Sequence, residues 1–429
     1  MQTTEQPLLR RGLTMAPLAV SAIWFALYAQ WFTIPPIILP SQIAGLVANP
    51  GNAEMATGII AALGGIVALV AAPLVGALSD GTRGLQGRRR PFLISGTFAS
   101  CIALVLFGWA GQDGGLIIYA LAYLHLQFWW NWVAGPYAGL IPDVVPVKRQ
   151  AAASGWMNVL IILGIIAGNA VTRFFYTPRH PAPVIGAFIV LNLLCLMVTV
   201  MGVREPPASG APLRRSTKAF FRSFYLSPRQ YPSFYLVLGT RFLSNMGIWS
   251  VFTFLVFYLE TVFNMSQDAS TRLLAMLFIV GACLAIPASL AGVWLADRYG
   301  LVRVVQIVSW IMAVSTAAYV LIAIHPALAL IIPVIVVFSA ANGAYGAVDW
   351  YLALRVLPRG QDTGKDFGIW HVCLILPQII GPASTGVLIT AAKTLVSPEF
   401  AYELAFGIGA IWFILAAALV GRVRLAPAG

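Results

Sequence analysis

The chain has 429 residues, of which 60% are hydrophobic and 9% are charged, and its mean hydropathy is +0.86. This composition excludes a water-soluble protein, because a soluble core cannot bury so much apolar surface, whereas about 20 apolar residues wound as a helix span a bilayer. The net charge of +12 does not indicate nucleic-acid binding, since the basic residues are spread over many loops and do not gather in one patch.

Apolar stretches of membrane-spanning length follow one another along the chain. With about 20 residues in each span and short loops between them, we predict an all-α membrane protein with about twelve transmembrane helices. The first stretch follows Arg10 and Arg11 and lacks a small-residue cleavage site, so we expect an uncleaved first helix. The predicted spans are 15–36, 57–79, 91–110, 115–141, 152–172, 183–203, 233–259, 271–296, 301–324, 327–354, 367–392 and 401–421.

The longest polar interruption divides the predicted helices into two sets of six. We predict a six-helix half at 1–203, a cytoplasmic linker at 204–232 and a six-helix half at 233–429. The second span of each half ends in a similar way, with Asp80 and Asp297 each placed before a basic loop. Two duplicated halves with a binding site between them are typical of a secondary transporter.

The distribution of basic residues over the loops predicts the orientation. Of the 26 Lys and Arg, 21 fall in alternate loops on one side, four (Arg173, Arg179, Arg272 and Lys393) fall on the other side, and Arg241 lies within a span. By the positive-inside rule both termini are cytoplasmic, in a plasma membrane or bacterial inner membrane.

Cysteine and histidine residues give no sign of a metal or redox centre. The four Cys lie within predicted spans without CxxC spacing, and the four His show no ligand-like spacing. We expect no metal, no cofactor and no enzymatic activity, since no nucleophile–base constellation is visible.

Two loops resemble a known family. The stretch Leu295–Gly300, LADRYG, is similar to the G-x-L-A-D-R-x-G signature of the major facilitator superfamily, with Val293 where the first glycine is usual. In the first half, Asp80 is followed seven positions later by the stretch Gly87–Phe92, GRRRPF. This longer form resembles the sucrose transporter and glycoside-pentoside-hexuronide branch of that superfamily.

Two further stretches, at 134–146 and 364–382, resemble bacterial relatives of the same branch. The resemblance covers nearly the whole chain and implies the major facilitator fold, with two six-helix halves and transport by alternating access.

Charged residues at the ends of the second and eighth spans predict a conformational latch. The Asp80 carboxylate at a helix C-terminus opposes the helix dipole and needs basic partners, which the following arginines supply. Partners on different helices would hold the ends of the spans together in one state only. The competing hypothesis is that the arginines only set the topology. The predicted latch residues are Asp80, Arg88, Arg89, Arg90, Asp143, Asp297 and Arg298.

Two charges at similar depth in the membrane predict an ion pair. Arg241 lies roughly 12 Å into span seven, and Asp349 lies roughly 9 Å deep in span ten, at a rise of 1.5 Å per residue. The pair is either a substrate-linked or proton-linked switch, or mutual neutralisation. His125 is a further candidate for coupling, as is His371.

Amide and aromatic side chains within the spans predict a site for a polyhydroxylated solute. Amides give paired donors and acceptors to hydroxyl groups, and flat rings cover the apolar face of a sugar. Aromatic residues in a span also serve in packing, so that interpretation stays open. The candidate substrate-binding residues are Gln30, Gln127, Trp130, Asn131, Asn158, Asn245, Trp249, Asn342, His371 and Gln378.

These observations predict a monomeric secondary transporter of a sugar or glycoside whose partners are the solute, the lipid bilayer and, for symport, protons. Spans one, four and five hold no mid-depth carboxylate, so facilitated diffusion competes with proton symport as the mechanism. A sodium site of the melibiose type finds no matching acidic groups. Two competing hypotheses for the function are an exporter of amphipathic compounds and a non-transporting membrane assembly or sensing protein.

The predicted orientation can be tested by labelling single cysteines from outside intact cells. We expect an impermeant maleimide to react with a cysteine at position 50 and not with one at position 215, because the basic loop is cytoplasmic. The reverse pattern would invert the topology.

Overall fold

The computed structural model describes residues 16–84, 87–205, 231–356 and 363–424, and these residues are almost entirely helical. Within them, the only β-structure is an isolated bridge between Thr177 and His180. The predicted all-α fold is confirmed.

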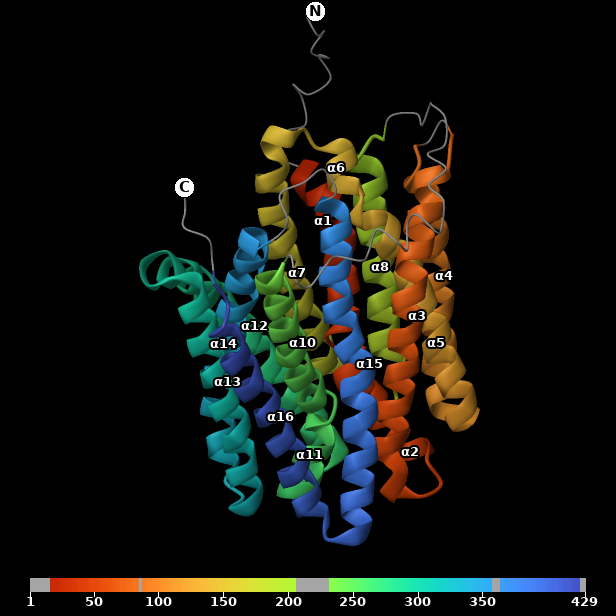
Figure 1. Ribbon diagram of the computed structural model, residues 1–429. Coiled ribbons are helices and arrows are strands. Elements are labelled where there is room, and N and C mark those ends of the chain that lie inside the picture. The colour runs from red at the N-terminus through yellow and green to blue at the C-terminus, as the bar shows by residue number, and fades with distance from the viewer. Residues whose placement is uncertain (1–15, 85–86, 206–230, 357–362, 425–429) are drawn as a thin grey trace, which may run out of the picture.

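Long helices of the first half run up and down past one another, with α6 at one end of the molecule and α2 at the other (Figure 1). Their bounds are α1 Ala16–Trp31, η2 Ile34–Ile38, α2 Leu39–Leu46, η3 Pro50–Asn52, α3 Ala53–Gly81, α4 Arg90–Trp109, η4 Ala110–Gly114, α5 Gly115–Ala138, α6 Leu140–Val144, α7 Val147–Phe175 and α8 Ala182–Gly202.

The predicted second half also consists of long helices. Their bounds are α10 Pro232–Phe252, α11 Leu255–Phe263, α12 Gln267–Tyr299, α13 Leu301–Ile324, α14 Leu328–Val356, α15 Thr363–Leu395 and α16 Pro398–Val420. We call the end of the molecule where α3 ends and α4 begins the basic end, after Arg88–Arg90, and the end where α3 begins the opposite end.

Helices long and apolar enough to cross a membrane dominate the part of the chain that the structure describes. It holds ten such stretches, or up to eleven if α10 and α11, bent by 47° at their junction, count as one span. One of the ten, Arg90–Val144, contains both α4 and α5. The membrane fold is therefore shown, and the exact number of twelve crossings stays a prediction.

Apolar side chains on the outer faces of these helices remain exposed. On α4, Phe98, Ile102, Val105 and Trp109 recur at helical spacing, and each is at least 50% exposed. Such a stripe suits contact with lipid tails, because hydrocarbon does not penalise apolar surface.

Two hydrophobic cores lie each within one predicted half. One gathers buried residues between Ala19 and Val203, and another gathers residues between Phe234 and Val423. A third joins Ile37 and Ala53 of the first half to residues of the second half. The division into halves at 203 and 233 stays a prediction, and residues 206–230 of the linker lie outside the described residues.

Glycines bring the helices close together within the first half. A Cβ atom added at Gly164 or Gly168 of α7 would lie 2.3 and 2.1 Å from the carbonyl oxygens of Phe25 and Ala29 on α1. Small residues permit this approach of two backbones, which maximises packing contacts where lipid gives no hydrophobic drive between helices.

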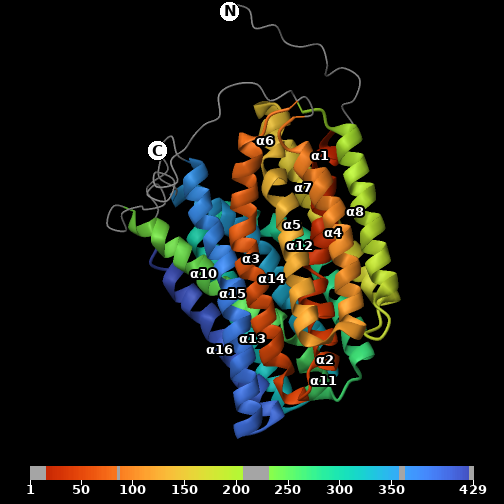
Figure 2. The ribbon, with the colours of Figure 1, turned by 90° about the vertical axis from the view of Figure 1, so that its right-hand side faces the viewer.

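The two halves contact each other along α3 and α15, which lie side by side in both views (Figures 1 and 2). A Cβ atom at Gly58 of α3 would lie 2.2 Å from the carbonyl oxygen of Pro382, and one at Gly386 of α15 would lie 2.4 Å from that of Glu54. We call this contact the α3–α15 seam. A second contact between halves joins α7 to α12.

The role of the α7 glycines can be tested with a matched pair of substitutions. Gly168→Ala should destabilise the protein by about 1–3 kcal/mol, because the new methyl group meets the α1 backbone. Gly155→Ala on the same helix meets nothing within 4 Å and gains the same helix propensity, so it serves as the control. The melting temperature in detergent distinguishes the two, and equal melting temperatures would contradict close packing at Gly168.

Candidate functional site

A cluster of ionic bonds at the basic end centres on Arg89, whose side chain is only 7% exposed. Its guanidinium lies 2.5 Å from Asp80 Oδ1, donates to Asp143 Oδ2 at 2.9 Å and also donates to the Ser79 hydroxyl. Arg88 donates to both carboxylate oxygens of Asp143, and this hydrogen bonding is the main cause that raises the pKa of Arg88 above its ordinary value.

This cluster ties together four segments of the first half. Asp80 ends α3, the arginines precede α4, and Asp143 lies in α6. Glu205, after α8, accepts a hydrogen bond of 2.8 Å from the Arg89 backbone N–H. Gly87 has φ +86°, a left-handed backbone conformation, and a Cβ atom there would lie 2.3 Å from the Glu205 side chain. The turn therefore requires glycine. The cluster therefore holds together helices of one half.

The other predicted latch residues lie apart from the cluster. Arg90 begins α4 and forms none of the ion pairs found among the described residues. Asp297 and Arg298 are exposed at the end of α12, where the Arg298 guanidinium lies 5.7 Å from the centre of the Trp294 ring. Among the described residues, the predicted latch residues thus form no ion pair between the halves in this conformation.

Arg241 and Asp349 form a hydrogen-bonded ion pair between α10 and α14. The Asp349 side chain is fully buried, and that of Arg241 is 13% exposed. Both helices belong to the second half, so the pair neutralises two charges inside one half. Since removing one partner would leave a charge in a medium of low dielectric, each residue depends on the other.

Gln30 and Trp130 lie in the interior of the first half, with no exposed surface. The Trp130 indole donates to Gln30 Oε1 at 3.1 Å, and Gln30 Nε2 donates to Asn192 Oδ1 at 2.8 Å. A buried amide must find partners within the protein, and here those partners are an indole and a second amide. In this conformation the two side chains bond to each other and to Asn192, and their contact with a solute stays a prediction.

His125 lies on the outer face of α5 rather than in the interior. It is exposed on the same helix face as Ile117 and Leu121, which are 75% and 60% exposed. Its ring accepts a hydrogen bond of 3.1 Å from the Trp129 indole one turn later. This position at the lipid-facing surface does not suit a group that couples protons to a central solute.

Other candidates on α5 and α10 face inward. Gln127 is half-buried and donates to the Tyr123 hydroxyl at 2.8 Å. Asn131 and Asn245 are buried. Each side-chain amide donates a hydrogen bond of 2.8 Å to the backbone carbonyl four residues earlier in its own helix. Trp249 is half-buried, one turn beyond Asn245.

Helix α3 determines which of these residues gather. Gly64 faces Tyr123 and Gln127 of α5, whereas Gly65 faces α15 next to Gln378. Gln378 is half-buried, and on the same helix Gly381 packs against Trp249 of α10. Three predicted residues, Gln127, Gln378 and Trp249, thus lie on α15 itself or on helices that pack against α3 or α15.

The remaining candidates lie on other helices. Asn158 is exposed on α7, and Asn342 is half-buried on α14. The His371 side chain lies outside the described residues. Among those described, no group of three or more His, Cys, Asp and Glu is arranged to hold a metal ion.

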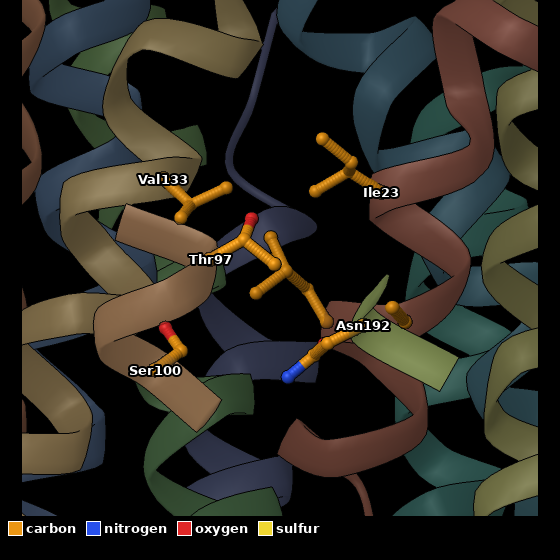
Figure 3. A pocket seen from close by; sticks show the side chains of 7 residues that line it. Ile23, Thr97, Ser100, Val133 and Asn192 are labelled. Atoms are coloured by element: carbon orange, nitrogen blue, oxygen red, sulfur yellow. The ribbon is translucent and has the colours of Figure 1, made fainter. Parts of the chain in front are cut away.

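A small cavity inside the first half is too small for a sugar (Figure 3). It measures about 10 Å³ and is lined by Thr97, Ser100 and Asn192 together with apolar side chains. The buried Ser100 hydroxyl has no hydrogen-bond partner within the described residues. A cavity of this size and polarity suits about one water molecule.

The sequence patterns missed a buried ion pair at the opposite end. Glu54, 2% exposed, bonds to Lys393 of α15 and accepts a 2.6 Å hydrogen bond from Tyr402 of α16. Both charges lie just outside the predicted spans, where charges are normally hydrated. An acidic residue in the first turn of an apolar helix was the one signal in the sequence.

This architecture of many apolar helices, with the predicted halves in contact along α3 and α15 and along α7 and α12, is typical of a secondary transporter. The chain belongs to the Major Facilitator Superfamily, whose family model matches residues 18–361. It is therefore a transporter of this superfamily and not an enzyme.

Curated relatives are sucrose transport proteins of low identity. The sucrose transport protein SUT1 of rice, Oryza sativa subsp. japonica, is 26% identical over 250 residues, which are 48% of this chain and 46% of that protein. SUC3 of Arabidopsis thaliana is 28% identical over 186 residues, or 35% and 31% of the two chains. The match thus spans about half the length of the rice relative.

Solved structures share the fold over nearly the whole chain. A D-xylose–proton symporter has a TM-score of 0.73 at 14% identity, covering 95% of this chain and 97% of that one. The nucleoside transporter NupG has the same TM-score and identity, covering 95% and 99%. A bacterial homologue of the human lysosomal transporter Spinster has a TM-score of 0.70 at 15% identity, covering 96% and 98%.

Energetic coupling between Arg241 and Asp349 can be measured by a double-mutant cycle. Arg241→Met or Asp349→Leu alone should each destabilise the protein by about 3 kcal/mol or more, and the double variant should be milder than either. Thermal unfolding in detergent gives the values, and Arg355→Met, at the exposed end of α14, is the control. Additive effects of the two substitutions would exclude the coupling.

Proposed function

We propose that the protein is a secondary transporter that moves a sugar or glycoside across the plasma or bacterial inner membrane by alternating access, in symport with protons. The observation that carries the proposal is the asymmetry of contacts between the halves. At the opposite end, Ser41 O and Glu54 Oε1 accept hydrogen bonds from Gln267 and Lys393 of the second half. The Met55 N–H donates to the Thr390 hydroxyl there. At the basic end the Arg89 cluster stays within one half. One closed end is what alternating access requires of each state.

The solute would bind amide and aromatic groups near the seam. Gln127 lies beside α3, Gln378 lies on α15 and Trp249 lies beside α15, and amides supply the donors and acceptors that hydroxyl groups need. The similarity to sucrose transport proteins supports a sugar. The remaining proposed ligands are Asn131, Asn158, Asn245, Asn342 and His371.

Proton coupling would use the Arg241–Asp349 pair. A carboxylate that is buried beside a single cation loses its charge when a proton binds, which frees the arginine for a solute. The basic-end latch would form when that end closes, by bringing Asp297 and Arg298 of α12 towards the Arg89 cluster. Both termini would then be cytoplasmic, as the loop charges indicate.

An exporter of amphipathic compounds is the second candidate, because α1 carries a half-buried aromatic cluster. The ring centres of Trp24, Tyr28 and Trp31 lie 5.3–6.1 Å apart. Aromatic faces bind flat apolar compounds without the amides that a sugar requires.

Transport by purified protein in vesicles tests the function. We expect uptake of radiolabelled sucrose or another glycoside, weakened in apparent affinity by about 1–3 kcal/mol in Gln127→Ala and Asn245→Ala, because hydroxyl groups lose their partners. Asn52→Ala, exposed at the opposite end, is the control.

The same assay separates symport, facilitated diffusion and export. If transport is proton symport, collapse of the pH gradient should abolish accumulation of the sugar in the vesicles. Uptake that does not depend on the gradient would exclude symport and indicate facilitated diffusion. Trp130→Ala should lower stability rather than affinity, since Trp130 is buried. If the protein exports amphipathic compounds, the amide variants should transport normally. Trp24→Ala should then change which compounds are transported.

A further inference from the structure

One buried ion pair crosses between the predicted halves at the opposite end. Glu54 lies in the first turn of α3 with its side chain 2% exposed, and it bonds to Lys393 of α15, which is 17% exposed. The Glu54 Oε1 atom also accepts a hydrogen bond of 2.6 Å from the Tyr402 hydroxyl of α16. The Lys393 ammonium lies 5.2 Å from the centre of the Tyr402 ring. A single carboxylate of the first half therefore holds two helices of the second half.

This pair differs from the other ion pairs found among the described residues. Those lie within one half, either around Arg89 or between Arg241 and Asp349. They do not have to break when the halves move as bodies. Of the pairs found, only the one between Glu54 and Lys393 has to break when the halves separate at the opposite end.

The backbones of α3 and α15 touch beside the ion pair. A Cβ atom added at Gly386 would lie 2.4 Å from the Glu54 carbonyl oxygen. The Met55 N–H donates to the Thr390 hydroxyl at 3.2 Å. Because these contacts are made by Glu54 and its neighbour in the chain, α3 cannot leave α15 at this end without drawing Glu54 away from Lys393.

The closed end leaves the Glu54 carboxylate dependent on its partner. Its Oε2 atom is buried and has no hydrogen-bond partner among the described residues. Loss of Lys393 would place an unpaired charge at this buried position, which destabilises the closed arrangement strongly. If the end opens, water reaches the same carboxylate and hydrates it. Lys393 therefore stabilises Glu54 in the closed conformation and is dispensable in the open one.

We propose that Glu54 and Lys393 form the gate of the opposite end: their bond holds that end closed, breaks each time it opens to solute, and makes closure depend on both charges. An interaction made in one conformation only shifts the equilibrium between the two, so this pair determines how often the opposite end is open. The inference rests on the proposed alternating access, and it gives the pair no part in binding the solute.

A cysteine at position 57 can report on the gate without any solute. Thr57 is fully buried, lies one turn from Glu54, and its hydroxyl has no hydrogen-bond partner among the described residues. Thr57→Cys would be introduced into a variant without the four native cysteines, and its maleimide labelling rate measured in purified protein at one fixed pH. The closed seam buries this position, so labelling requires opening.

The charge variants give distinct expectations. Lys393→Met should raise the labelling rate roughly tenfold or more, because the closed state then holds an unpaired carboxylate. Loss of a nearby positive charge would by itself slow labelling, since the thiolate is the reactive form, so a faster rate reports opening. Glu54→Gln should also label faster than the parent. The double variant should label more slowly than Lys393→Met, because it contains neither buried charge.

Two controls separate the gate from general effects. Arg179→Met removes an exposed cation at the same end and should keep the parent rate. Cys195 is buried against α1 within the first half, so it reports on loosening of the fold. Retained as the only cysteine, it should label equally slowly with and without Lys393→Met.

The gate is overturned if Lys393→Met leaves labelling at position 57 as slow as in the parent, or if the increases of the two single variants multiply in the double variant. Equal acceleration at position 57 and at Cys195 overturns it too, because the pair would then only stabilise the fold. Should Lys393→Met fail to fold, Glu54→Gln gives the same test without an unpaired carboxylate, and a rate equal to that of the parent overturns the proposal.

Failure of the gate can be told apart from failure of the proposed function. Labelling needs no solute, so faster labelling in Lys393→Met supports the gate even if the vesicles take up no sugar. Conversely, sugar uptake together with a labelling rate that responds to neither charge would remove the gate and leave the transport function intact.

Discussion

Hydrocarbon does not solvate an ionised side chain, and the arrangement of this bundle depends on that constraint. Charges placed at or inside the helices are stable only beside a counter-charge. In the described part of the chain this requirement is met at three places: around Arg89 at the basic end, between Arg241 and Asp349 in the second half, and between Glu54 and Lys393 at the opposite end. Each place fixes the relation of particular helices, because separating the partners would leave a charge in a medium of low dielectric.

The consequence of a pair depends on whether its partners belong to one half or to two. Pairs inside a half, such as Arg89–Asp143, keep their geometry when the halves move as bodies, so they stabilise each half. A pair across the seam, such as Glu54–Lys393, must break whenever the halves separate there. It can therefore bias the conformational equilibrium, which an interaction common to both states cannot do.

Helix positions and loop charges could be predicted from the sequence, because apolar runs of membrane length and basic loops are local patterns. The proximity of Asp80 to Arg89 follows from one loop, and that of Arg241 to Asp349 from equal depth. Glu54 escaped prediction because it lies at a span end, where charge normally reaches water. The hydrogen bonds between Gln30, Trp130 and Asn192 could not be predicted, because polarity alone does not tell whether an amide faces a solute or another buried amide.

Glycine spacing carries information on helix orientation that polarity lacks. Gly58 and Gly65 are seven residues apart, so they lie on one face of α3, and both contact α15. Gly64, rotated by one residue, contacts α5 instead. Since a close backbone contact fixes the rotation of a helix about its axis, it also fixes which polar side chains face the neighbouring helix. The glycine pattern of α3 thus determines that Gln127 and Gln378 lie on different faces of this helix, one towards α5 and one towards α15.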